Sequence, residues 1–127
     1  MKVLVQYMAI GAAGFVGAIA RVAVARVVGR MFPVRFPVGT LIINVTGSFI
    51  LGFFLTYIAD RPSVSDTTRL AIGAGFVGAY TTFSTFMFES NALVDEGAEI
   101  QAMMNLVGSL ALGLLAVRAG ILVGRRF

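Results

Sequence analysis

Four long apolar stretches, separated by charged residues and prolines, constrain this chain more than any other feature. They cover residues 3–20, 36–59, 70–88 and 100–117. Each is close to the ~20 residues that an α-helix needs to cross about 30 Å of hydrocarbon. Only 13% of the 127 residues are charged, whereas about 25% are charged in a typical soluble domain. We therefore expect one all-α integral membrane domain, residues 1–127, with four transmembrane helices.

The three prolines mark the expected connections between these helices. Pro33, Pro37 and Pro62 all lie between apolar stretches, where a missing N–H does not break a helical ladder. The predicted connections are short and make neighbouring helices antiparallel; they cover residues 29–37, 59–67 and 93–99. The first stretch also resembles a secretory signal peptide. Its apolar core is longer than the ~7 to 15 residues of such a segment, so we expect it to be retained.

The absence of cysteine and histidine removes most enzyme chemistry. It excludes disulfides, thiolate or imidazole metal sites, and catalytic triads that contain histidine. The six carboxylates lie almost entirely at span ends and form no paired catalytic site, so we predict that the protein is not an enzyme. The net charge of +4 is spread over the helix ends, which indicates contact with membrane lipid and no nucleic-acid binding.

The basic residues give only a weak orientation signal. Four spans place both termini and the second connection on one side of the membrane. Five basic residues lie on that side and three on the other: Lys2, Arg61, Arg69, Arg125 and Arg126 against Arg26, Arg30 and Arg35. Such asymmetry normally orients a membrane protein. Here it permits either orientation, or both in one membrane, and therefore a dual-topology dimer.

Small residues indicate where the helices approach one another. Gly120 and Gly124 repeat the Gly-x-x-x-Gly spacing that allows close contact between backbones. Gly14 and Gly17 share one side of the first span, and Gly47 is expected to face a neighbour in the second.

A polar stripe follows one face of the second span. Thr40, Asn44 and Ser48 succeed one another at i+4 spacing, and Gly52 extends the stripe. One interpretation is hydrogen bonding between helices, worth ~0.6 to 2 kcal/mol per contact. The other is a track of donors for an ion.

The third span contains poor helix formers at its centre. Glycines and β-branched residues collect there, namely Gly73, Gly75, Gly78, Thr81 and Thr82. We predict a break near mid-membrane, between half-helices over residues 68–78 and 82–93. Its free carbonyls can bind a cation, and its free amides favour an anion. An unbroken helix with packing glycines is the alternative.

Phe83 and Phe86 lie three residues apart, hence on one side of the second half-helix, beside Ser84 and Thr85. Two phenylalanines at this spacing are usually core residues. An aromatic ring nevertheless has a positive edge, which can stabilise a small desolvated anion. The rings alone leave both interpretations open.

The charges within the spans favour an anion. The first span contains Arg21, no acidic residue lies within the first, second or fourth span, and Glu89 closes the third. Small dimeric multidrug exporters also have four helices, but they need an acidic residue in the first helix to bind cationic drugs. An intramembrane arginine is a functional candidate, although Arg21 can instead snorkel or pair with Glu89.

Taken together, these residues resemble the CrcB family of Fluc fluoride channels. The resemblance covers nearly the whole chain. It rests on GFVGAIAR at residues 14–21, GTLIINVTGS at 39–48, GFVGAYTTFSTF at 75–86 and NLVGSL at 105–110. It implies an antiparallel dual-topology homodimer in a prokaryotic plasma or inner membrane, with two pores that pass fluoride passively out of the cytoplasm. It also implies a structural sodium ion at the dimer centre.

The resemblance assigns roles to individual residues. Phe83 and Phe86 look like the rings whose edges meet fluoride, and Asn44 looks like the amide donor of the pore. Further hydroxyl donors near the path would be Thr40, Ser84, Thr85 and Ser109, and vestibular or structural charges would be Arg21 and Glu89. The backbone carbonyls of Gly78 and Thr81 look like the sodium ligands, two from each subunit.

The chain departs from the family pattern at two places where some relatives have hydroxyls: Met87 follows Phe86, and Gly113 lies one turn beyond Ser109. The predicted path past the two rings therefore has few hydroxyl groups. Two rival functions remain open, a secondary transporter of small solutes and a noncatalytic membrane protein that assembles or modulates partners.

Overall fold

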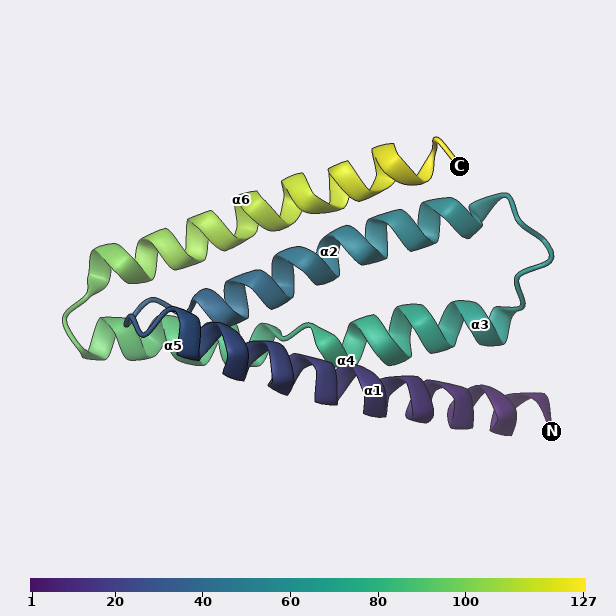
Figure 1. Cartoon of the computed structure of the whole chain (residues 1–127), viewed down its shortest axis with the longest axis horizontal. Helices are drawn as coiled ribbons and strands as arrows, with labels where there is room; N and C mark the ends of the chain where they lie inside the picture. Colours follow the sequence, from purple (N-terminus) through teal and green to yellow (C-terminus); the bar gives the residue numbers. More distant parts are fainter.

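A computed structural model describes residues 1–127 as four antiparallel helical rods (Figure 1). Three rods are continuous: α1 (Lys2–Met31), α2 (Val38–Ala59) and α6 (Glu99–Gly124). The third rod consists of α3 (Asp66–Leu70), the π-helical segment η1 (Ala71–Val77), α4 (Gly78–Tyr80) and α5 (Phe83–Asp95). All four rods are long and apolar enough to cross a membrane. The prediction of four helical spans is confirmed.

The helices extend beyond the apolar stretches from which they were predicted. The first span continues through Arg21, Arg26 and Arg30 and ends only at Met31. A charged residue does not end a helix, because the long side chain of arginine lies along apolar surface and carries its charge to the interface. The connections are consequently shorter than expected and cover residues 32–37, 60–65 and 96–98.

The turn between α5 and α6 depends on one glycine. Gly97 has a φ of +73°, which side-chain-bearing residues rarely adopt. The Ala98 amide then donates to Leu93 O over 2.8 Å, as in a Schellman C-cap. This turn reverses the chain and sends α6 back alongside α2.

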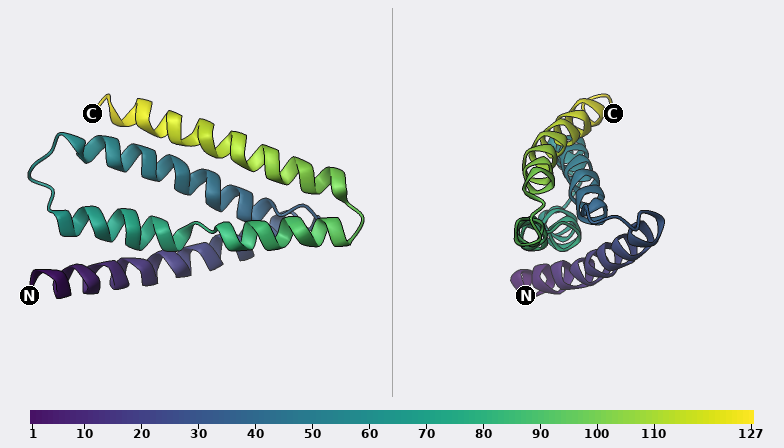
Figure 2. Two further views of the ribbon diagram at one scale, coloured as in Figure 1. Left: turned by 180° about the vertical axis from the view of Figure 1, so that it is seen from behind. Right: turned by 90° about the vertical axis from the view of Figure 1, so that its left-hand side faces the viewer.

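Glycines bring α2 and α6 into backbone contact, and Figure 2 shows the two helices side by side. A Cβ on Gly120 would lie 2.2 Å from Phe49 O, and one on Gly52 would lie 2.4 Å from Val117 O. A Cβ on Gly124 would lie 2.8 Å from Phe53 O. The close approach predicted from the Gly120–Gly124 spacing is confirmed, and its partner is α2.

A second pair of glycines joins α1 to the third rod. A Cβ on Gly17 would lie 2.3 Å from Phe76 O, and one on Gly75 would lie 2.7 Å from Ile10 O. Gly47 of α2 also lies against this rod, because its added Cβ would meet Thr81 Cγ2 at 2.2 Å. The predicted contact faces of the first and second spans thus both pack on the third.

The third rod is interrupted at Thr81 and Thr82, whose backbones are extended at φ/ψ of −79°/160° and −150°/119°. The predicted break is therefore present, two residues later than the expected end at Gly78. Gly73 and Gly75 remain helical within η1, and Gly75 packs closely on α1. The chain resumes as α5 where the Thr82 hydroxyl accepts a hydrogen bond from the Thr85 amide over 3.2 Å, a typical N-cap.

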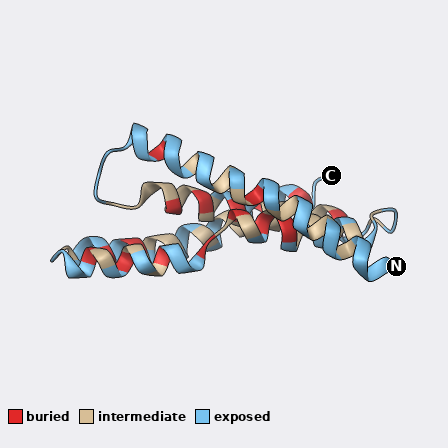
Figure 3. Ribbon diagram, turned by 90° about the horizontal axis from the view of Figure 1, so that it is seen from below, coloured by how far each residue is buried: buried red, intermediate tan, exposed pale blue.

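Only 18 of the 127 residues are buried, and Figure 3 shows them on the inner faces of the helices. Large apolar side chains such as Phe15, Leu110 and Leu114 are exposed. An exposed apolar surface of this extent needs lipid or a partner to cover it. The fold is that of a multi-pass membrane protein.

Candidate functional site

The polar stripe of α2 lies against the break in the third rod. Asn44 Nδ2 donates to Thr82 O over 2.9 Å, and the Thr82 amide donates to Asn44 Oδ1 over 2.8 Å. One amide side chain therefore satisfies both backbone groups of an extended residue that has no helical partners. The interhelical interpretation of the stripe is correct for Asn44. Its predicted role as a pore donor stays a prediction.

The break leaves two carbonyls without their helical donors. In a continuous helix, the amides of Thr82 and Thr85 would bond to Gly78 O and Thr81 O. Here the Thr82 amide donates to Asn44 Oδ1 and the Thr85 amide donates to the Thr82 hydroxyl. Both carbonyls belong to the predicted sodium ligands. No cluster of acidic side chains offers an alternative metal site, so a cation here would have oxygen ligands from the backbone.

An elongated hollow, which we call the Phe groove, lies between α2, α5 and α6. It has a volume of about 400 Å³, and its lining includes Asn44, Ser48, Phe83, Phe86, Ser109 and Gly113. A smaller hollow of about 240 Å³ adjoins it and shares Asn44, Ser48 and Phe83, and it reaches Thr81 and Thr82 at the break. No acidic or basic side chain lines either hollow.

The two phenylalanines meet edge to face in the Phe groove. Their ring centroids are 6.1 Å apart and their planes are inclined by 62°. Phe86 is 5% exposed, whereas Phe83 is 72% exposed. Burial is therefore consistent with core packing for Phe86 and inconsistent with it for Phe83.

The hydroxyl groups near the break are engaged with one another. Thr82 Oγ1 donates to Thr85 Oγ1 over 3.0 Å, and Ser84 Oγ lies 3.5 Å from Thr82 Oγ1. Ser48 donates to Asn44 O within its own helix over 2.7 Å. Among the four hydroxyl donors that the resemblance assigns, Ser109 lines the Phe groove, as does Ser48 of the polar stripe; Thr85 lines a different cavity, described next.

Arg21 and Glu89, the two charged residues predicted for the vestibule, line this other cavity, which we call the charged cavity. Its volume is about 460 Å³, and its lining includes Arg21, Arg26, Thr40, Thr82, Thr85 and Glu89. Glu89 Oε2 is buried without a hydrogen-bond partner, so no ion pair with Arg21 engages this oxygen. Thr82 lines the charged cavity as well as the hollow beside the Phe groove, which places the break between the two.

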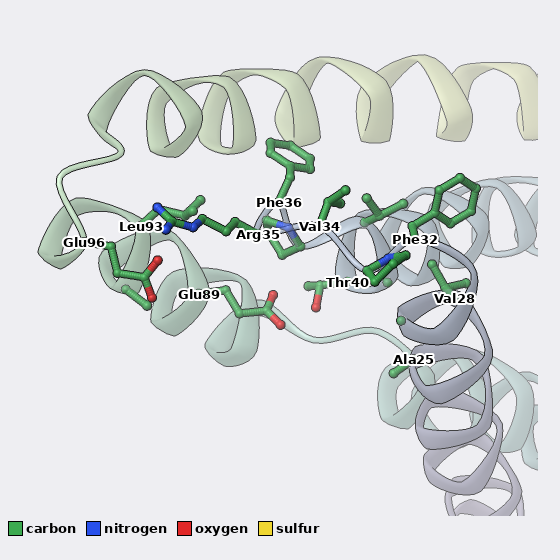
Figure 4. A pocket seen from close by; sticks show the side chains of 16 residues that line it. Ala25, Val28, Phe32, Val34, Arg35, Phe36, Thr40, Glu89, Leu93 and Glu96 are labelled. Atoms are coloured by element: carbon green, nitrogen blue, oxygen red, sulfur yellow. The ribbon is translucent and has the colours of Figure 1, made fainter.

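A fourth hollow, of about 380 Å³, opens beside the α1–α2 connection and shares Thr40 and Glu89 with the charged cavity. Figure 4 shows these two side chains pointing toward one another, with Arg35 and Glu96 nearer the end of the bundle. The polar lining therefore continues from the loop end of the molecule to the break.

Four polar residues of this region escaped the sequence prediction. The Tyr80 hydroxyl lies 2.9 Å from Thr46 Oγ1, and buried Asn105 of α6 donates to buried Ser90 of α5 over 2.9 Å. The signal for these residues in the sequence is a polar side chain within an otherwise apolar helix. Sequence spacing identifies neighbours on one helix only, so it did not reveal these pairs.

The chain resembles known proteins along nearly its whole length. The family model described as "CrcB-like protein, Camphor Resistance (CrcB)" matches residues 8–121. The fluoride-specific ion channel FluC of Acidobacterium capsulatum is 43% identical over 121 residues, which are 95% of this chain and 97% of the relative. The FluC proteins of Solibacter usitatus and Hydrogenobaculum sp. are 38% and 37% identical and cover 95% and 94% of this chain, and 99% and 97% of their own lengths.

These relatives bear the name of ion channels and not of enzymes. Residues 8–121, which the family model matches, include parts of all four helical rods, the break and the residues that line the Phe groove and the charged cavity. The chain therefore belongs to the CrcB family.

Proposed function

We propose that this protein is a fluoride-specific ion channel that passes fluoride passively out of the cytoplasm. The observation that carries the proposal is the edge-to-face pair of Phe83 and Phe86 beside the amide of Asn44, in a groove without acidic or basic side chains. The family relatives bear the name of the same activity.

The chemistry of the groove suits a small, strongly hydrated anion. A selective pore replaces the water around its ion with fixed donors. The Asn44 amide nitrogen carries two hydrogens, of which Thr82 O accepts one, so the other remains for fluoride. The ring edges of Phe83 and Phe86 add positive partial charge, and no carboxylate is present to repel the ion.

The remaining predicted residues complete the proposed path. Thr40, Ser84, Thr85 and Ser109 supply hydroxyl groups, while Arg21 and Glu89 are charges of the vestibule. The roles of Thr40, Thr85, Ser109, Arg21 and Glu89 are supported by their positions in the cavities described above, and Ser109 shares its hollow with both rings. The role of Ser84 is supported by its place next to Thr82 Oγ1.

We further propose an antiparallel dual-topology homodimer, with residues 1–127 as its single domain and two pores. In support, the apolar surface of one chain is largely exposed, Phe83 included, and the basic residues divide five to three between the two sides. A sodium ion at the centre would bind four carbonyls, those of Gly78 and Thr81 from each subunit. The loss of their helical donors supports this assignment.

Purified protein in liposomes tests the channel proposal. With a potassium gradient and valinomycin to set the potential, a fluoride electrode should record rapid passive efflux while chloride is retained. Slow, saturable or proton-coupled flux would instead indicate a secondary transporter. Absence of fluoride efflux from folded, dimeric protein would overturn the channel proposal.

A crystallographic experiment tests the cation site. Crystals grown with a heavier monovalent cation in place of sodium should show an anomalous peak between two copies of the Gly78–Thr81 segment. A map without this peak, from crystals that contain the dimer, would remove the sodium assignment.

A further inference from the structure

Three consecutive hydrogen bonds join α6 to α5 beside the Phe groove. Ser109 Oγ donates to Asn105 Oδ1 over 3.2 Å, Asn105 Nδ2 donates to Ser90 Oγ over 2.9 Å, and Ser90 Oγ donates to Phe86 O over 2.7 Å. We call this series the Asn105 relay. Asn105 is 1% exposed and Ser90 is 4% exposed, so the middle of the relay is dry.

The relay has a single direction, which its own chemistry imposes. A serine hydroxyl has one hydrogen to donate, and Ser90 gives it to Phe86 O. Ser90 Oγ can then only accept, so the NH₂ group of Asn105 faces Ser90 and its oxygen faces Ser109. The hydroxyl hydrogen of Ser109 therefore points toward Asn105 and away from the groove.

Both ends of the relay line the Phe groove, but its two middle residues do not. Ser109 and Phe86 belong to the lining, whereas Asn105 and Ser90 lie outside it. The relay thus connects a hydroxyl on one side of the groove with the backbone of a ring residue on the other. Hydrogen bonds that only held two helices together would not need to begin and end at residues that line the same hollow.

We propose that Asn105 and Ser90 are positioning residues for ion conduction, acting through Phe86 and Ser109. This proposal rests on the proposed fluoride channel. Ser90 holds the carbonyl of Phe86 and thereby the turn of α5 that carries the ring. In the empty groove, the Ser109 hydroxyl donates to Asn105 Oδ1. When an anion arrives, the hydroxyl donates to the anion instead.

The exchange explains why a relay is useful in a pore. A buried donor without a partner is costly, and a donor that binds an ion too firmly prevents it from leaving. In the empty groove, Asn105 Oδ1 gives the Ser109 hydroxyl an acceptor. In the occupied groove, it competes with the anion for the hydrogen of that hydroxyl. Ser109 therefore contributes to binding without trapping the ion.

Two substitutions test the relay without touching the groove. Ser90→Ala removes the central hydroxyl, and Asn105→Leu replaces the amide by an apolar side chain of similar size. We expect each to slow fluoride efflux from liposomes about tenfold, the effect of roughly one lost buried hydrogen bond. Ser90→Thr keeps the hydroxyl and should restore the rate.

Asn91→Ala is the matched control. Asn91 follows Ser90 directly, is exposed, and bonds only to Asp95 Oδ2 of its own helix over 2.8 Å. Its removal should leave efflux unchanged. If Ser90→Ala and Asn105→Leu conduct at the rate of the unmodified protein, the proposal is wrong.

A double-substitution cycle separates positioning from a structural tie. If Asn105 acts through Ser109, the two effects are coupled, and the rate loss of the Asn105→Leu/Ser109→Ala protein should be smaller than the product of the two single losses. Rate losses that multiply in the double variant would mean that the two residues act independently and would overturn the proposal.

A measurement that needs no conduction separates this proposal from that of the channel. With 4-fluorophenylalanine at position 86, we expect one sharp ¹⁹F resonance in the unmodified protein and in Asn91→Ala, and a shifted or split one in Ser90→Ala. An unchanged resonance would overturn the positioning role, even if the unmodified protein moved no fluoride. Absence of efflux from the unmodified protein would overturn the channel alone.

Discussion

At the scale of single residues, adjacent and similar side chains have different environments. Phe83 and Phe86 lie on one side of α5 and contact each other, yet one is exposed and the other buried. Asn44 and Asn105 are both amides within apolar helices, and each bonds to a different part of the third rod. A residue's contribution here depends on which groups it faces across the helices.

Replacement of Phe83 by isoleucine tests the ring edge. The change keeps apolar bulk but removes an aromatic contact worth about 0.5 to 1.5 kcal/mol, so we expect fluoride efflux to fall roughly three- to tenfold with the dimer intact. The matched control is Phe88→Ile, on the same helix and equally exposed but outside the groove lining. Equal fluoride efflux rates in both variants would mean that Phe83 is an exposed apolar residue without a role in conduction.

Replacement of Asn44 by aspartate tests the amide. The carboxylate cannot donate to Thr82 O and brings negative charge into the groove, so we expect loss of conduction and a free energy of unfolding lower by about 1 to 3 kcal/mol. Efflux assays and denaturation in detergent measure the two effects. Gln101→Glu makes the same chemical change at an exposed position of α6 and should have neither effect. Conduction that survives in Asn44→Asp would contradict the proposed role.

At the scale of elements, glycines make the closest helix contacts, and hydroxyl groups cap the N-termini of α3 and α5. Gly120 and Gly124 allow α6 to touch α2, and Gly17 and Gly75 allow α1 to touch η1. The N-cap of α5 is the Thr82 hydroxyl. Element positions therefore depend on small residues whose substitution has large consequences.

Replacement of Gly120 by alanine should separate α2 from α6. The added Cβ would lie 2.2 Å from Phe49 O, and relief of such overpacking costs about 1 to 3 kcal/mol. Gly29→Ala is the control, since nothing lies within 4 Å of its added Cβ. Thermal unfolding in detergent should give a lower Tm for the first variant only. Similar Tm values would show that the helices tolerate the extra methyl group.

At the scale of the whole molecule, a single chain leaves exposed residues to which we assign ion and cation binding. Phe83 and Gly78 are both exposed, and the freed carbonyls of one break are too few to surround a cation. In the proposed homodimer, a second copy would cover exposed apolar faces and bring a second break to the first. The weak charge asymmetry permits that copy to be inverted.

Cysteine labelling tests the inverted arrangement. The natural chain has no cysteine, so Ser63→Cys provides one site in the α2–α3 connection. We expect a membrane-impermeant maleimide to label about half of the molecules from each side. Ala98→Cys, at the opposite end of the bundle, should give the complementary half. Labelling of either variant from one side only would exclude dual topology.

Local sequence features predict the four spans, the existence of a break and the absence of most enzyme chemistry. These properties follow from local quantities, namely the length of apolar stretches, the missing cysteine and histidine, and the clustered glycine and threonine. The resemblance carried by residues 14–21, 39–48, 75–86 and 105–110 also identified the family, whose model matches residues 8–121.

The tertiary structure decided where the break lies and which polar groups meet. Gly78 is a poor helix former, yet the helix continues to Tyr80, because the interruption lies where Asn44 and the Thr82 hydroxyl replace the helical partners. The contacts of Asn105 with Ser90 and of Tyr80 with Thr46 join different helices. Helical periodicity determines which residues share a face of one helix, but only packing between helices determines what that face meets.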